Sequence, residues 1–144
     1  MSETIGDRMT GDHRRCDQLL TVVEGAAQRA DWPSAVGQAQ AFAEAMEHHF
    51  RFEENELFPE LESASPMAAG PTGVMRMEHE QVRQLLADLQ AAAQAEDSDD
   101  CIGIIETLHM LIQQHNAKEE GILYPLADQA LEHQAAALLA RFSD

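Results

Sequence analysis

Two copies of one histidine–glutamate pattern run through this chain, 66 residues apart. Residues 49–59 read HFRFEENELFP and residues 115–125 read HNAKEEGILYP, so both reduce to His-x-x-x-Glu-Glu-x-x-Leu-aromatic-Pro. A spacing of four places the histidine and the first glutamate one turn apart on the same face of a helix. Imidazole nitrogens and carboxylate oxygens are common ligands of transition metals. Each copy therefore carries a candidate pair of metal ligands.

A second histidine accompanies each copy at a fixed distance. His13 lies 36 residues before His49, and His79 lies 36 residues before His115. An acidic residue directly precedes both His13 and His79. The register thus selects four of the seven histidines in the chain. The predicted metal-ligating set has six members: His13, His49, Glu53, His79, His115 and Glu119.

The type and number of these ligands suit a reactive metal centre. Six nitrogen and oxygen ligands, with no thiolate, favour iron or manganese over a structural zinc site. Two bridging glutamates would hold two metal ions close together, with two histidines on each. Four protein bonds per ion leave positions for an oxo or hydroxo bridge and for an outside ligand. A single His-x-x-x-Glu pair is more often an ordinary helix contact, but six matching positions in one register favour the metal site.

The candidate ligands fall within a helical pattern. Apolar residues recur in steps of three and four, which marks one face of a helix, and no β-hairpin signal is present. The first predicted helix runs from about Ile5 to Ala30, and the second has Pro33 in its first turn and ends near Pro59; a long loop over Ser63–Gly73 follows. The third predicted helix has an apolar face from Met75 to Ala93 and leads to an acidic turn and N-cap over Glu96–Asp100. The fourth has an apolar face from Ile105 to Ile122, and a short helix from Ala127 to Phe142 packs on the outside.

The predicted fold class is all-α: an up-down-up-down four-helix bundle with a short C-terminal fifth helix. Residues 1–144 are expected to form a single domain. The 66-residue offset then divides the bundle into two helical hairpins, about 5–62 and 71–126, related by a pseudo-twofold axis. Each hairpin would supply one histidine from its first helix and one His-x-x-x-Glu pair from its second.

Composition excludes several classes of partner. The formal net charge of −17 disfavours a nucleic-acid backbone and an anionic membrane surface, since both attract clustered lysine and arginine. No apolar run approaches the roughly 20 residues of a transmembrane helix. The segment Met1–Asp12 is polar and acidic, unlike a signal peptide. Cys16 and Cys101 form no CxxC motif and no disulfide framework, so a reduced, cytoplasmic location is expected.

The pattern as a whole resembles the hemerythrin-like HHE cation-binding domain family. The resemblance rests on the four histidines, the two glutamates and the Leu-aromatic-Pro endings, and it spans His13 to about Leu126. It implies a four-helix bundle around a non-haem diiron centre in which Glu53 and Glu119 bridge. Members of the family bind dioxygen or nitric oxide, sense oxygen or iron, or serve iron–sulfur cluster repair.

Two departures from the family bear on function. Oxygen-carrying hemerythrins have a fifth histidine one turn before the helix-C histidine, and this chain has Met75 there. The set of four histidines and two glutamates is closer to the metal domain of the cluster-repair proteins. Those proteins also carry an N-terminal cysteine-bearing domain, for which this chain is expected to have no room.

Three functions follow as hypotheses. The first is a diiron-binding protein that takes up a small diatomic ligand, dioxygen or nitric oxide, in sensing, stress response, iron handling or iron–sulfur repair. The alternative is an enzyme that reduces dioxygen or peroxide at the same centre. Manganese or zinc are alternative occupants of the site. A purely structural metal bundle is disfavoured, because structural sites are usually closed.

Residues beside the predicted ligands receive plainer interpretations. Glu54 and Glu120 are expected to belong to a solvated face, with support of the ligands as the alternative. Cys16 is expected to be a small buried apolar residue, with a thiol near the metals as the alternative. Tyr124 is expected in the core at the bundle end, where a hydrogen bond to the site stays open. His48, His109 and His133 are expected to flank the site or lie on the surface.

Overall fold

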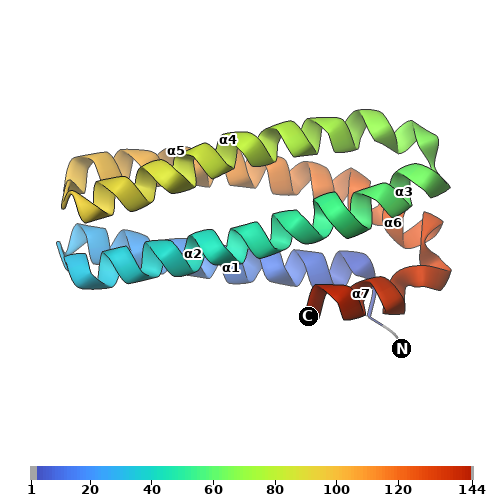
Figure 1. Cartoon of the computed structure of the whole chain (residues 1–144), viewed down its shortest axis with the longest axis horizontal. Helices are drawn as coiled ribbons and strands as arrows, with labels where there is room; N and C mark the ends of the chain where they lie inside the picture. Colours follow the sequence, from blue (N-terminus) through green and yellow to red (C-terminus); the bar gives the residue numbers. More distant parts are fainter. Residues whose placement is uncertain (1–2, 144) are drawn as a thin grey trace.

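The computed structural model describes residues 3–143, which are helical almost throughout and contain no strand. The all-α prediction is therefore confirmed. Four long helices lie side by side, and three short ones gather at one end (Figure 1). The long helices are α1 (Ile5–Gln28), α2 (Trp32–Phe52), α4 (Ala69–Gln94) and α5 (Ser98–Lys118). The short helices are α3 (Phe58–Ala64), α6 (Tyr124–Ala130) and α7 (Ala135–Ser143).

The connections α1–α2 and α4–α5 have the same local structure. Asp31 caps α2 by accepting a hydrogen bond from the backbone of Ser34, and Asp97 caps α5 in the same way. The residue before each cap is left-handed, with φ of 55° at Ala30 and 56° at Glu96. The pair Ala30 and Glu96 keeps the 66-residue offset, so the repeat includes the turns. The predicted cap at the acidic turn is confirmed.

The core consists of two apolar clusters. One fills the bundle between the site and the α1–α2 and α4–α5 turns, and includes Leu20, Phe42 and Ile105. The other fills the end covered by α3, α6 and α7. Buried polar residues lie between the two clusters. The predicted apolar faces are buried as expected, except that Ile122 is 62% exposed.

Two π-helical segments interrupt the long helices at equivalent places. They span Glu53–Leu57 and Glu119–Leu123, and each closes with a bond across five residues, from Phe58 N–H to Glu53 O and from Tyr124 N–H to Glu119 O. The wider turn returns Leu123, not Ile122, to the core face. This explains why the straight-helix register fails at Ile122.

The predicted end of the second helix and the predicted loop that follows it are both wrong. The second helix does not end near Pro59, because after the π segment this proline falls in the first turn of α3, where its missing N–H is tolerated. The expected loop Ser63–Gly73 is mostly helical: a 3-10 turn, Pro66–Ala68, leads directly into α4 at Ala69. Pro71 does not break α4, since the first-turn N–H groups need no helical partner.

The expected helix Ala127–Phe142 is two helices. The first, α6, begins at Tyr124 as the continuation of α5 beyond its π segment. A 3-10 turn, Glu132–Gln134, follows and separates it from α7. Leu138, Leu139 and Phe142 of α7 are buried, and α7 contacts α1 and α2. The expectation that the last helix packs on the outside of the bundle is thus confirmed for α7.

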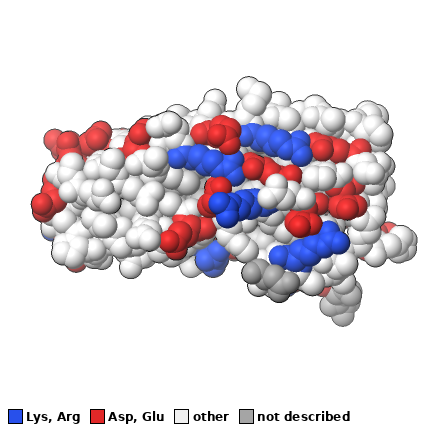
Figure 2. All heavy atoms as spheres, viewed as in Figure 1, with Lys and Arg blue, Asp and Glu red and all other residues white. Residues whose placement is uncertain are grey.

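Charged side chains of both signs alternate on the face shown in Figure 2, and the lysine and arginine side chains in view gather toward the half that carries α3 and α7. Arg76 pairs with Glu62, and Arg141 pairs with Glu56.

Within the described residues no helix is long and apolar enough to cross a membrane. The single-domain interpretation of residues 1–144 stays a prediction; Met1, Ser2 and Asp144 lie outside the described residues.

Candidate metal centre

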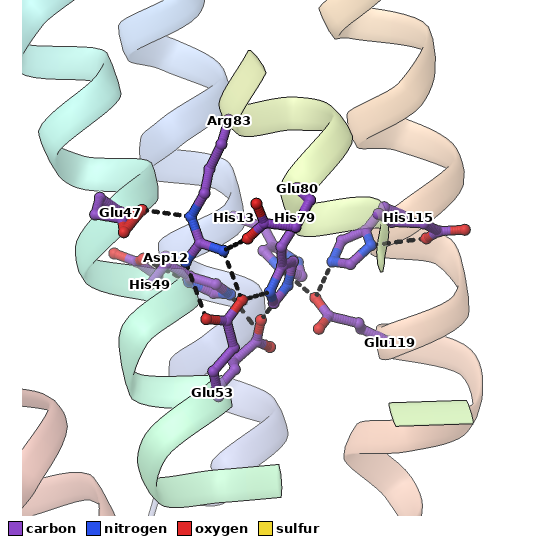
Figure 3. A network of polar contacts seen from close by, with 12 residues as sticks. Asp12, His13, Glu47, His49, Glu53, His79, Glu80, Arg83, His115 and Glu119 are labelled. Atoms are coloured by element: carbon purple, nitrogen blue, oxygen red, sulfur yellow. Dashed lines mark hydrogen bonds and ion pairs between the residues drawn. The ribbon is translucent and has the colours of Figure 1, made fainter. Parts of the chain in front are cut away.

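The structure brings the six predicted ligand residues together at one level of the bundle (Figure 3). Each long helix supplies one histidine, and each π segment supplies a glutamate as its first residue. The side chains are withdrawn from solvent, with Glu53, His79 and Glu119 fully buried and the others at most 6% exposed. The set consists of His13 on α1, His49 on α2, His79 on α4, His115 on α5, Glu53 and Glu119.

Each glutamate reaches histidines of two different helices. Glu53 lies 3.4 Å from Nε2 of His49, one turn earlier in its own helix, and 3.1 Å from Nε2 of His79. Glu119 repeats this arrangement, at 3.3 Å from Nε2 of His115 and 3.1 Å from Nε2 of His13. Both carboxylates therefore lie between two imidazoles, which is the position that a bridging ligand needs.

A second ring of carboxylates holds the outer side of every imidazole. In each case the Nδ1 nitrogen donates a hydrogen bond to the carboxylate, which fixes the orientation of the ring and turns Nε2 inward. The four pairs are His49 with Asp12 at 2.7 Å, His115 with Glu78 at 2.8 Å, His79 with Glu54 at 2.7 Å and His13 with Glu120 at 2.7 Å.

The assignment to a solvated face is wrong for Glu54 and confirmed for Glu120, but both residues also support a ligand, which was the alternative. Glu54 is half-buried and also accepts two hydrogen bonds from Arg83, at 2.9 and 3.0 Å. Glu120 stays partly exposed but binds His13 directly. The sequence contained a signal for this ring, because its four carboxylates also repeat at the 66-residue offset. That signal was not interpreted, since each carboxylate serves a histidine on another helix.

Tyr124 projects its hydroxyl into the middle of the site. Its Oη lies 2.6 Å from Oε2 of Glu53, 2.9 Å from Oε1 of Glu119, 3.1 Å from Nε2 of His13 and 3.3 Å from Nε2 of His49. The residue is in the core, as expected, and the open question of its hydrogen bonding is answered. A motif ending in Leu-aromatic-Pro could not reveal that the aromatic side chain points at the ligands.

When no cation is present, the surrounding carboxylates raise the pKa values of two of the histidines. Burial lowers the pKa of His49, but the charge of Glu53 and the hydrogen bonds to Asp12 and Glu53 outweigh it and raise this pKa to about 10. Burial likewise lowers the pKa of His115, but Glu119, Glu53 and Glu78 raise it to about 9.

The pKa values of Glu53 and Tyr124 are shifted in opposite directions. Burial raises the pKa of Glu53, but the charge of His49 and hydrogen bonds hold it well below its ordinary value. Burial and the charges of Glu119 and Glu53 raise the pKa of Tyr124 well above its ordinary value. The Glu53 carboxylate therefore stays ionised at neutral pH and draws positive charge into the site.

Four atoms at the centre test whether these residues suit a metal. Oε1 of Glu53, Nε2 of His79, Nε2 of His115 and Oε2 of Glu119 are buried and form no hydrogen bond. Oε1 of Glu53 and Nε2 of His79 are 3.1 Å apart, but their angles are not those of a hydrogen bond. Unpaired buried polar atoms cost about 1–3 kcal/mol each, and more when charged. A bound cation removes this cost, so the donor set fits one.

The geometry contains two overlapping groups of donors. Atoms of Glu53, His79, His115 and Glu119 all lie within 4.8 Å of one another, and so do atoms of His13, His49 and Glu119. Because Glu119 belongs to both groups, two cations held there would be neighbours that share a carboxylate.

A small internal cavity adjoins the site on the side of the larger apolar cluster. Its volume is about 10 Å³, and its lining includes His13, His49, His115 and Cys16. Cys16 is buried, as expected, and burial and Asp12 raise the pKa of its thiol to about 12, so it stays protonated. The thiol nevertheless lies beside the imidazoles, which the sequence had left as the alternative.

The remaining histidines lie away from the centre. His109 and His133 are exposed, as predicted. His48 flanks the bundle and donates a hydrogen bond from Nε2 to the backbone oxygen of Phe142 at 2.8 Å, which ties α2 to the last turns of α7.

Comparison with known proteins identifies one family. The model of the family described as "Hemerythrin HHE cation binding domain" matches residues 4–127, which contain all six candidate ligands, the outer carboxylates and Tyr124. Searches of curated proteins and of solved structures produced no significant match.

Proposed function

The chain belongs to the hemerythrin HHE cation-binding domain family, and on that premise we propose that it binds two iron ions and presents them to a small diatomic ligand or peroxide. The proposed protein ligands are the six residues of the candidate site: His13, His49, Glu53, His79, His115 and Glu119. The observation that carries the proposal is the set of four unpaired buried atoms on Glu53, His79, His115 and Glu119. Donor atoms of these four residues lie within 4.8 Å of one another.

Two ions, rather than one, are favoured by the arrangement of the donors. The two groups of donor atoms share Glu119, and Glu53 also lies between histidines of both groups. The overall topology proposed is the up-down-up-down four-helix bundle, with two pseudo-symmetric hairpins.

Iron is favoured by the chemistry of the donors. Imidazole and carboxylate ligands without thiolate suit iron, and manganese or zinc are the alternative occupants. A bound iron pair would supply reversible redox change and open coordination positions for a small ligand. The protein's own part is to hold the imidazole rings in one orientation and to exclude bulk water from the site.

The size of the cavity supports a small ligand over an organic substrate. A volume of about 10 Å³ holds little more than one water-sized group. Its lining combines imidazoles with apolar side chains such as Phe50 and Ile112. Such a cavity has no room for an organic substrate, and this favours the smallest ligands.

The test of the metal ligands compares matched glutamates. Glu53→Ala and Glu119→Ala are expected to lose nearly all iron, because each removes a carboxylate shared by two histidines. Glu106→Ala, a change at an exposed glutamate of α5, serves as the control and should keep full iron content. Equal iron content in all three variants, measured by elemental analysis, would overturn the assignment.

A diiron enzyme that reduces dioxygen or peroxide is the alternative function. Both functions need the same open positions, so turnover separates them. A carrier or sensor consumes at most a stoichiometric amount of peroxide or dioxygen per site. Sustained consumption over many turnovers, absent in the Glu119→Ala variant, would favour the enzyme.

A further inference from the structure

The two halves of the site differ at one position of the repeated motif. The aromatic residue before the proline is Phe58 in the first copy and Tyr124 in the second. Both rings approach a histidine, with centroids 6.0 Å apart for Phe58 and His79 and 5.6 Å apart for Tyr124 and His13. Only Tyr124 carries an oxygen, so the pseudo-symmetry of the ligand atoms is broken on the side of His13 and His49.

Hydrogen bonding alone does not satisfy the surroundings of this oxygen. Four polar atoms lie within 2.6–3.3 Å of Oη, two from the glutamates and two from the histidines. Carboxylate oxygens only accept hydrogen bonds. The phenol has one hydrogen for the two carboxylate oxygens that lie 2.6 and 2.9 Å away. A cation among the five atoms would satisfy all of them at once.

The distances also suit a ligand that shares a metal with its neighbours. Two ligands at right angles around one ion are separated by about 1.4 times the bond length, or roughly 3 Å for bonds of about 2.1 Å. The four distances from Oη bracket this value. Oη therefore lies at distances from these four donor atoms that ligands of one ion would have.

We propose that Tyr124 is a fifth protein ligand of the metal held by His13, His49, Glu53 and Glu119, bound through Oη as a phenolate. The inference rests on the diiron assignment proposed above. On binding, the O–H bond breaks, its proton passes to the solvent buffer, and Oη donates an electron pair to the ion.

As a consequence, the two ions would differ in their number of protein ligands. The half with His13 and His49 has five protein donors, whereas the half with His79 and His115 has four. The side chain at the equivalent place there is Phe58, which has no donor atom. The ion held by His79 and His115 would therefore keep one more open position for an outside ligand.

The experiment uses the fact that the chain contains a single tyrosine. The full-length protein, loaded with ferric iron, is examined by optical and resonance Raman spectroscopy, with iron content measured on the same sample. Phenolate bound to ferric iron gives a visible charge-transfer band, and excitation in that band enhances tyrosine ring vibrations. The expected result is such a band, with vibrations that shift when ring-deuterated tyrosine is incorporated. Because this measurement is made on the native chain, it needs no variant.

Two variants complete the test. Tyr124→Phe is expected to lose the band while retaining helical circular dichroism. Phe58→Leu, the change at the equivalent position, is expected to keep the band, because it removes aromatic packing but no oxygen. Two irons per chain without tyrosine vibrations would overturn the proposal and leave the diiron assignment intact. Absence of iron would overturn both, and a band that survives in Tyr124→Phe would overturn the phenolate.

Discussion

Glu120 accepts the Nδ1 hydrogen of His13 at 2.7 Å, although 107 residues separate the two in the sequence. The same contact joins Glu54 and His79, again at 2.7 Å. In both copies, the glutamate follows directly after the one that lies between two histidines. The two consecutive glutamates of the motif thus have different roles. The first faces the centre of the site, and the second accepts a hydrogen bond from the outer nitrogen of an imidazole on another helix.

This relationship predicts the effect of Glu120→Ala. Without its carboxylate partner, the imidazole of His13 loses its fixed orientation, and metal affinity should fall by about 10–100-fold. Competition with a chelator measures the affinity of the full-length protein. The matched control is Glu106→Ala, an exposed glutamate on α5. Affinities that are equal in the two variants would contradict the role of the outer ring.

Metal binding is expected to release protons. In the metal-free fold the pKa of His49 is raised to about 10 and that of His115 to about 9, so both imidazoles are protonated at pH 8. A metal ion requires their lone pairs and displaces these protons. Affinity should therefore weaken as pH falls, and proton release should diminish as pH rises toward 10. Calorimetry in buffers of different ionisation enthalpy measures the release; binding heats that do not depend on the buffer would contradict it.

Met75→His tests whether an outside ligand binds to the ion held by His79 and His115. Met75 is buried one turn before His79 on α4, so a histidine there would face the same ion. The added ligand should fill a position and weaken the binding of azide, followed by optical titration of the ferric protein. Met75→Leu keeps an apolar side chain and should bind azide as the native protein does. If Met75→His binds azide equally well, the ion held by His79 is not the one that takes outside ligands.

Removal of the metal should lower the stability of the fold. The unpaired atoms of Glu53, His79, His115 and Glu119 then remain buried without partners. A ligand present at 100 times its dissociation constant adds about 2.7 kcal/mol to the free energy of unfolding. Thermal unfolding followed by circular dichroism should show a lower midpoint for the chelated protein. Identical midpoints with and without iron would indicate that nothing binds at the centre.

The helices were predictable because their apolar faces and their repeat agree with one another. His13, His49, His79 and His115 lie on faces that also carry core residues, so their burial followed from the helical period. The helix ends were less predictable, because Pro59 and Pro71 were interpreted as breakers. The sequence did not show that a π segment precedes Pro59 or that Pro71 lies in the first turn of α4.

The inner residues of the site were predictable for the same reason, whereas their partners were not. A histidine and a glutamate four residues apart share a face, so local spacing brings them together. Contacts such as Glu78 with His115, or Tyr124 with Glu53, join different helices and depend on how the helices rotate against each other. That rotation is set by packing, which the hydrophobic period fixes only roughly. Whether the six residues bind metal stays a prediction.

The most direct test of the account is the iron content of the full-length protein purified from iron-replete cells, determined by elemental analysis. The account predicts about two iron ions per chain, because two groups of donors share a carboxylate. One zinc ion per chain, or no metal retained after reconstitution with iron, would contradict it.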